Sequence, residues 1–149
     1  MKEPKPLLQF KVYPGQYSNK HNSKRGLFFW VLVYGSRSDM HKKVGRDGFE
    51  ACCVSSSNHV NEIGTLVFYR DALGGRIVSH ECVHAALTYL FESKRLNKFI
   101  DGLIEGSAGG WNFKQEGSSV DESEEVFCYA VGDMVGQIYS KLYAEGMLE

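Results

Sequence analysis

The sequence has no excess of charge of either sign. Its 149 residues include 17 lysines and arginines against 18 aspartates and glutamates, a formal net charge of −1. A chain so close to neutral lacks the basic surface typical of nucleic-acid binding, so we expect no nucleic-acid partner. The 43% hydrophobic and 23% charged residues are ordinary for a globular protein, and the length suits one domain over residues 1–149.

Long apolar runs are also missing. No segment approaches the roughly 20 apolar residues that a membrane-spanning helix needs, so we expect no contact with a membrane. The first residues, Met1 to Pro6, are polar and lead into a short apolar patch rather than the hydrophobic core of a signal peptide. These two features predict a cytoplasmic protein.

Cysteine is sparse and irregularly spaced. The four cysteines are Cys52, Cys53, Cys82 and Cys128, and no C-x-x-C pair occurs among them. Two are adjacent and two fall in expected helices, which favours reduced thiols over disulfides or a cysteine-bound structural zinc. We expect Cys82 to be a small buried hydrophobic residue.

The most informative stretch is His80-Glu81-Cys82-Val83-His84, an H-E-x-x-H pattern. It lies in an amphipathic run over residues 76–92, whose apolar positions recur at helical spacing. Histidines four residues apart leave the same face of a helix one turn apart, which suits two ligands of a tetrahedral zinc ion. Glu81 is then placed to take a proton from metal-bound water.

A third protein ligand is expected from the segment Asp121 to Ala130, which begins a second amphipathic helix. Asp121 is a plausible N-cap with Glu124 as its capping-box partner. Glu125 projects from a face that also carries small residues, and these would let the helix approach the histidine helix closely. We favour Glu125 as the third ligand, with Glu124 and Glu122 as alternatives. All three acids could instead serve the helix N-terminus.

This arrangement of motifs resembles the gluzincin zinc peptidases, and more narrowly small phage-encoded zinc peptidases. The resemblance rests on the segment Val78 to Ala86 and on the later segment Asp121 to Tyr129. It implies zinc held by His80, His84 and Glu125, with Glu81 as general base, and a location in the host cytoplasm. Larger gluzincins often hold Asp or Asn four residues after the ligand, whereas this chain has Tyr129.

The rest of the pattern predicts an α+β, zincin-like fold. We expect an N-terminal, mostly antiparallel sheet of about four strands, followed by two or three helices. The expected strands cover residues 7–13, 26–34, 49–54 and 64–70, and a short middle helix is expected over residues 96–104. The last strand leads directly into the histidine helix, so we expect it at the rim of the cleft with one edge free for an extended peptide.

Two loops are expected to carry little regular structure. Residues 35–48 form a charged connection in which Lys42, Lys43 and Arg46 could recognise an acidic partner or simply form a solvated turn. Residues 106–119 are rich in glycine, and there Trp111 and Phe113 could line a substrate pocket or cover the edge of the core.

The sequence supports three hypotheses about function. The first is a zinc metallopeptidase acting on a peptide or protein substrate, in which Tyr129, Tyr139, Arg70 or His59 could stabilise the oxyanion. The second is a non-catalytic host-interaction protein in which zinc is structural. The third is a chance occurrence of the motif. Replacing Glu81 by Gln separates the first two, because only a peptidase would lose a function.

Overall fold

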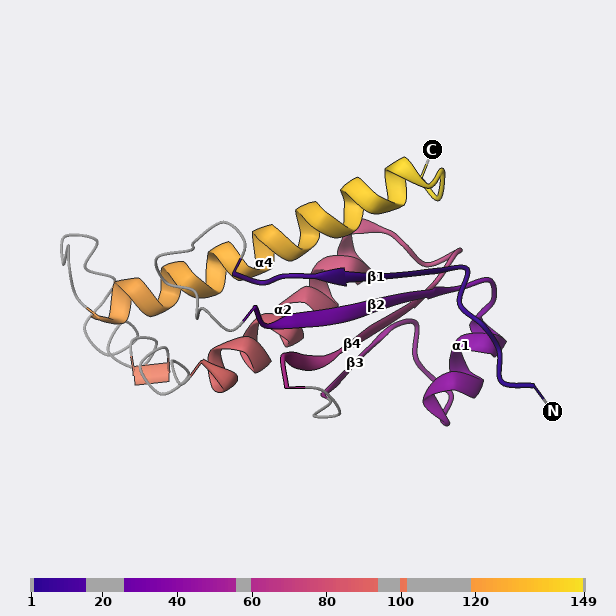
Figure 1. Cartoon of the computed structure of the whole chain (residues 1–149), viewed down its shortest axis with the longest axis horizontal. Helices are drawn as coiled ribbons and strands as arrows, with labels where there is room; N and C mark the ends of the chain where they lie inside the picture. The colour runs from indigo at the N-terminus through magenta and orange to yellow at the C-terminus, as the bar shows by residue number, and fades with distance from the viewer. Residues whose placement is uncertain (1, 16–25, 56–59, 94–99, 102–118, 149) are drawn as a thin grey trace.

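The computed structural model describes residues 2–15, 26–55, 60–93, 100–101 and 119–148, and for residues 119–125 it describes the backbone alone. Figure 1 shows the elements in chain order. They are β1 (Leu8–Val12), β2 (Phe28–Tyr34), α1 (Arg37–Val44), β3 (Cys52–Ser55), β4 (Glu62–Tyr69), α2 (Gly75–Glu92) and α4 (Ser119–Ala144). The fold is α+β, as predicted. The described residues contain no helix that is both long and apolar enough to cross a membrane.

The four strands form one mixed sheet in the order β1-β2-β4-β3. β1 and β3 pair antiparallel with β2 and β4 respectively, whereas β2 and β4 run parallel to each other. Two of the three pairings are therefore antiparallel, which agrees with the prediction of a mostly antiparallel sheet. β2 and β4 are the longest and most buried strands, and they occupy the centre because both of their faces can then be covered.

The predicted position of the last strand is wrong. β4 lies inside the sheet, paired along one side with β2 and along the other with β3, so it has no free edge. On this side of the sheet the edge strand is β3, a strand of four residues whose Val54 is 41% exposed. A short, partly polar strand loses less by leaving one side unpaired, so the apolar β4 takes the interior position.

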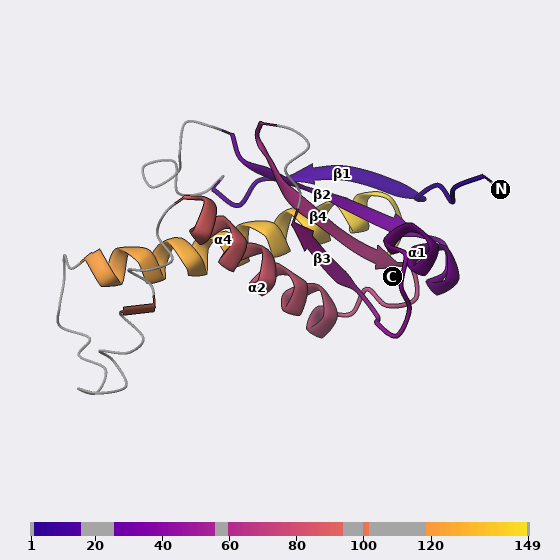
Figure 2. The ribbon, with the colours of Figure 1, turned by 90° about the horizontal axis from the view of Figure 1, so that it is seen from below.

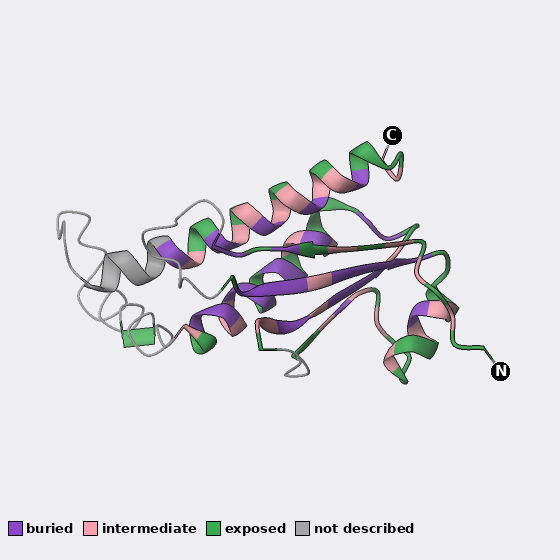
Figure 3. Cartoon of the chain, in the orientation of Figure 1, coloured by how far each residue is buried: buried purple, intermediate pink, exposed green. Residues whose placement is uncertain are grey.

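The helices lie on both faces of the sheet, and α2 and α4 share one of them (Figure 2). The main core lies between these two helices and that face. Its largest fully buried side chains include Phe29, Phe68, Tyr89, Met134 and Leu142. α1 covers part of the opposite face, where a smaller cluster includes Met40, Tyr34 and Val67. In Figure 3 the buried residues follow the central strands and the inner sides of the helices.

The expected loop over residues 35–48 contains a helix, α1. Ser36 caps its N-terminus, because the Ser36 Oγ accepts a hydrogen bond from the Asp39 N–H at 3.1 Å. Gly45 ends the helix in the left-handed conformation with φ 83°, which glycine adopts without steric cost. Met40 is fully buried against the sheet. The many polar residues of this segment lie on the solvent-facing side of the helix. Met40 is the one buried side chain that anchors it.

α4 differs from the sequence expectation in two respects. It begins at Ser119, so Asp121 lies inside the first turn and is not the N-cap. Its buried positions are Val126, Ala130, Met134, Ile138 and Leu142, whereas Gly132 and Gly136 are exposed. A Cβ atom at either glycine would meet nothing within 4 Å, so these small residues do not bring α4 close to α2.

Candidate metal centre

α2 places its histidines on the outer side of the helical layer. The buried side of the helix carries Val78, Cys82, Ala85 and Tyr89, which pack into the main core. The opposite side is exposed and includes His80 and His84. Because a helix turns once in 3.6 residues, the two imidazoles leave this exposed side one above the other. The predicted helix over residues 76–92 is confirmed as Gly75–Glu92.

The two imidazoles converge through their Nε2 atoms. The distance from His80 Nε2 to His84 Nε2 is 3.2 Å, and the ring planes are inclined by 72° with centroids 4.9 Å apart. Two nitrogens bound to one tetrahedral zinc ion lie about 3.3 Å apart, since each Zn–N bond is about 2.0–2.1 Å. The pair is thus arranged as two ligands of one metal ion would be. The His80 side chain is 66% exposed, which leaves room for further ligands.

Glu81 lies between the exposed histidines and the buried side of α2. Its Oε1 is 4.0 Å from His80 Nε2, and the residue is only 7% exposed. Burial raises the pKa of the Glu81 carboxyl, and the neighbouring His80 and His84 oppose that rise when they are protonated. A carboxylate with a raised pKa accepts a proton more readily at neutral pH, as a general base must.

The edge strand β3 runs beside this carboxylate. Burial raises the pKa of the Cys53 thiol to about 12, and the negative charge of Glu81 contributes to that rise. Cys82 is fully buried, and burial raises its pKa to about 12 as well. Both thiols therefore stay protonated at neutral pH, and all four cysteines are free. The prediction that Cys82 is a small buried hydrophobic residue is confirmed.

The expected third ligand stays a prediction. Glu125 belongs to α4, one residue before the buried Val126, but its side chain and those of Glu122 and Glu124 lie outside the described residues. Among the side chains that the structure describes, no third His, Cys, Asp or Glu joins the histidine pair to form a metal site. The described residues thus include both candidate nitrogen ligands and the candidate base.

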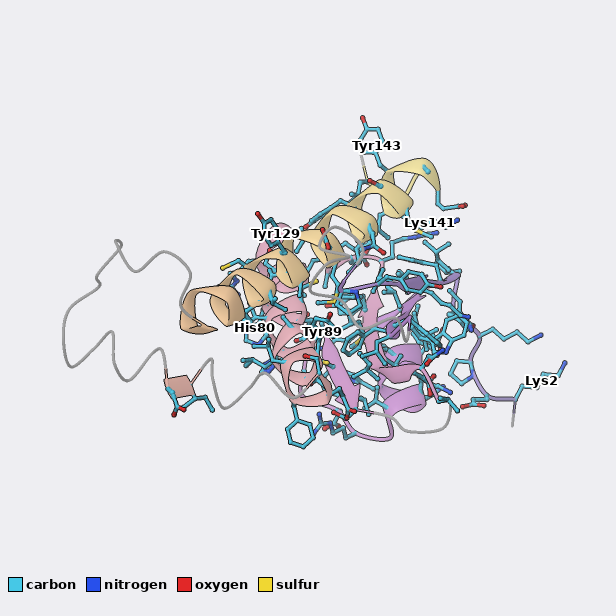
Figure 4. The ribbon with its side chains drawn as sticks, turned by 60° about the vertical axis from the view of Figure 1, so that its left-hand side comes forward. Lys2, His80, Tyr89, Tyr129, Lys141 and Tyr143 are labelled. Atoms are coloured by element: carbon cyan, nitrogen blue, oxygen red, sulfur yellow. The ribbon has the colours of Figure 1, made fainter. Side chains whose placement is uncertain are left out.

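The candidates for stabilising an oxyanion occupy different places. Tyr129 is 38% exposed on α4, at the same end of the helical layer as His80 in Figure 4, whereas Tyr143 lies at the other end. Tyr139 donates its phenolic O–H to the Leu73 carbonyl at 3.4 Å and so fastens α4 to the turn before α2. Arg70 follows the end of β4, and its backbone N–H donates to the Tyr34 carbonyl at 2.9 Å. His59 lies outside the described residues.

Sequence reasoning missed the contribution of β3. Nothing in the order of residues indicates that Cys53 lies close to Glu81, because the two residues are 28 positions apart and belong to different elements. The register that pairs Cys53 with Leu66 turns the Cys53 side chain toward the helical layer, where it packs on the main core.

Comparisons with known proteins leave the class open. No protein-family model, no curated protein and no solved structure matches this chain. The functional argument therefore rests on the residues themselves.

Proposed function

We propose that this protein is a zinc-dependent metallopeptidase with its centre at His80, His84 and Glu81. The observation that carries the proposal is the convergence of the two Nε2 atoms at 3.2 Å, beside a buried carboxylate 4.0 Å from one of them. Structural zinc sites are usually closed by four protein ligands, whereas catalytic sites keep a position for water. Two exposed histidines and a neighbouring base fit the catalytic type better.

In this proposal the metal and the side chains contribute different parts of the chemistry. A zinc ion bound here would supply a water with a pKa near neutrality and would polarise a carbonyl group. His80 and His84 would hold the ion, and we assign the third ligand to Glu125. Glu81 takes the proton from the attacking water and returns it to the leaving amine. Because Glu81 is buried beside the histidines, little solvent reaches its carboxylate.

The exposed edge of β3 is the part of the sheet nearest to this carboxylate that can bind a peptide. It replaces β4, which has no free edge. An extended substrate can add to an edge strand through main-chain hydrogen bonds, which hold a peptide without regard to its side chains. Cys53 and Glu81 lie close enough to interact electrostatically, so a peptide paired with β3 would pass beside the proposed centre.

The test is a comparison of wild type with Glu81→Gln. Glutamine preserves size and polarity but cannot take up the proton, so hydrolysis should fall by at least about a hundredfold while zinc content is unchanged. Both proteins are incubated with a peptide library or a host-cell lysate, and new termini are identified by mass spectrometry. Elemental analysis gives the zinc content of each sample.

The alternative is a non-catalytic interaction protein with a structural zinc. It predicts that wild type and Glu81→Gln bind the same zinc and produce the same termini. That outcome would remove the peptidase proposal and retain the metal site. If the wild-type protein contains no zinc, and His80→Ala has the same zinc content and produces the same termini, both the peptidase and the structural-zinc proposals are wrong.

A further inference from the structure

A concave surface lies on the sheet face opposite α2 and α4. It has a volume of about 1410 Å³, and residues of β2 and β4 form its floor. Trp30 and Thr65 are half-buried in this floor, whereas Leu32 and Val67 are buried beneath it beside Met40 of α1. We call this surface the sheet hollow. In Figure 4 the N-terminal segment that borders it, marked by Lys2, lies on the other side of the molecule from His80.

The walls of the sheet hollow come from two separate parts of the chain. One wall is the N-terminal segment over residues 2–6, and the other is the end of α1 with Lys43, Val44 and Arg46. An ion pair of 3.2 Å between Lys43 Nζ and Glu3 Oε1 joins the two walls. The Arg46 guanidinium lies 5.3 Å from the centre of the Phe49 ring and donates to the Cys52 Sγ at 3.7 Å.

Positive charge predominates around this surface although the chain as a whole has a net charge of −1. Lys2, Lys5, Lys43 and Arg46 line the hollow, against the carboxylates of Glu3 and Glu62. Lys11 is not a lining residue, but its ammonium lies 5.1 Å from the centre of the Trp30 ring. Lys2 and Lys5 are both exposed. The apolar floor and the cationic border together suit a ligand that carries both apolar groups and negative charge.

We propose that the sheet hollow is a docking site for an acidic peptide segment of a partner protein. Carboxylates of such a segment would meet the lysines of the border, and its apolar side chains would cover the half-buried Trp30 and the exposed Val54. A nucleic acid fits less well, because Glu3 and Glu62 would repel closely spaced phosphates and the chain has no net positive charge to attract them. The proposed zinc centre lies on the other face of the sheet, although the hollow and the proposed substrate edge share β3 residues Cys53, Val54 and Ser55.

Trp30 provides a direct probe of occupancy. The chain has two tryptophans, so Trp111→Phe leaves Trp30 as the sole source of tryptophan emission. This variant is titrated with a short peptide of repeating Glu-Leu-Glu units, with the corresponding Lys-Leu-Lys peptide and with an oligothymidine of similar charge. The acidic peptide should shift the Trp30 emission with saturation, and raising the salt concentration should weaken binding.

Two variants with the same change of charge separate local from general electrostatics. Lys2→Glu with Lys5→Glu alters the border of the hollow and should weaken binding of the acidic peptide by about tenfold or more. Arg76→Glu with Lys141→Glu alters exposed or half-buried positions on α2 and α4 and should change it by less than about twofold. Arg46→Gln serves as a second border variant, and circular dichroism checks that each protein is folded.

Three results would overturn the proposal. The first is no shift of Trp30 emission with the acidic peptide, or an equal affinity in the two double variants. The second is stronger binding of oligothymidine than of the acidic peptide. The third is self-association, measured by sedimentation, that Lys2→Glu with Lys5→Glu abolishes, since the hollow would then hold a second copy of the chain.

Discussion

At the scale of single residues, the main features are two exposed histidines and one buried acid on the same helix. The two Nε2 atoms lie 3.2 Å apart, which is possible because the histidines leave the same face of α2 one turn apart. The acid is buried because it faces the edge strand β3, so its ionisation is tied to the packing of the whole helical layer. Metal binding should therefore depend on the two histidines, and the stability of the metal-free protein on Glu81.

Replacing His84 by alanine should remove the metal and the stability that the metal supplies. Binding of zinc only to the folded state stabilises that state, since the unfolded chain cannot hold the ligands together. We expect zinc to raise the melting temperature of the wild type, a chelator to reverse the effect, and the His84→Ala variant to respond to neither. Differential scanning calorimetry with and without zinc measures this. An equal response of both proteins would show that zinc binds elsewhere.

The stability of the metal-free protein should depend on pH through Glu81. Its pKa is raised above the ordinary value of 4.5, so the folded state binds this proton more tightly than the unfolded state. Glu81 therefore contributes stability at low pH, and the contribution is lost as the pH rises through the raised pKa. With chelator present, Glu81→Gln should be more stable than wild type at neutral pH and equal to it near pH 4. Urea unfolding at several pH values measures the difference, and identical curves at all of them would refute it.

At the scale of the elements, the glycines show that the exposed side of α4 has free space around it, whereas β4 is closely packed against β3. Gly132 and Gly136 lie in the exposed part of α4, with nothing near the place of a Cβ. In β4, by contrast, a Cβ on Gly64 would overlap the Val54 carbonyl oxygen of β3. The edge strand thus packs against its neighbour so closely that only glycine fits.

Alanine substitutions at these glycines should change the free energy of unfolding in opposite directions in α4 and in β4. Gly132→Ala and Gly136→Ala should each raise the free energy of unfolding by about 0.5–1 kcal/mol, because alanine favours the helix. Gly64→Ala should lower it by about 1–3 kcal/mol, since β3 or β4 must shift to accept the methyl group. Chemical denaturation provides the values. Destabilisation by either α4 substitution would indicate a contact on that face of the helix.

At the scale of the whole molecule, one core joins the first strand to the last helix. Val12, Phe29, Phe68, Ala86 and Leu142 belong to the same buried cluster. Gln137 of α4 adds a polar link, because its amide accepts from the Tyr13 N–H at 2.8 Å and donates to the Tyr13 carbonyl at 2.9 Å. These links between the two ends of the chain favour unfolding as one unit.

Core substitutions far apart in the sequence should therefore each lower the stability of the whole domain, which unfolds in a single transition. We expect Phe29→Ala to cost about 3–5 kcal/mol and Leu142→Ala about 2–5 kcal/mol, each by leaving a cavity. Circular dichroism and tryptophan fluorescence should report coincident unfolding curves in both variants. Separate transitions for sheet and helices would contradict the expectation of a single domain.

The sequence by itself determined the features that depend on neighbours along the chain. Residues 76–92 were predicted as a helix from their apolar spacing, and the convergence of His80 with His84 follows from the turn of that helix. The strands β1, β2 and β4 were recognisable from their apolar and β-branched residues. Each of these depends on a local period that no distant residue changes.

The tertiary structure alone decided which strand forms the edge, where α1 is anchored and which residues surround Glu81. β4 could have been an edge or a central strand by composition, and competition among strands for pairing partners placed it between β2 and β3. α1 depends on one buried methionine, too weak a signal to separate a helix from a polar loop. Cys53 of β3 approaches Glu81 only because β3 pairs with β4 in one register. Lys43 of α1 approaches Glu3, which precedes β1, only because the sheet brings these parts of the chain together. Such contacts join residues that are distant in the chain, and their energies are decided by the packing of the whole fold.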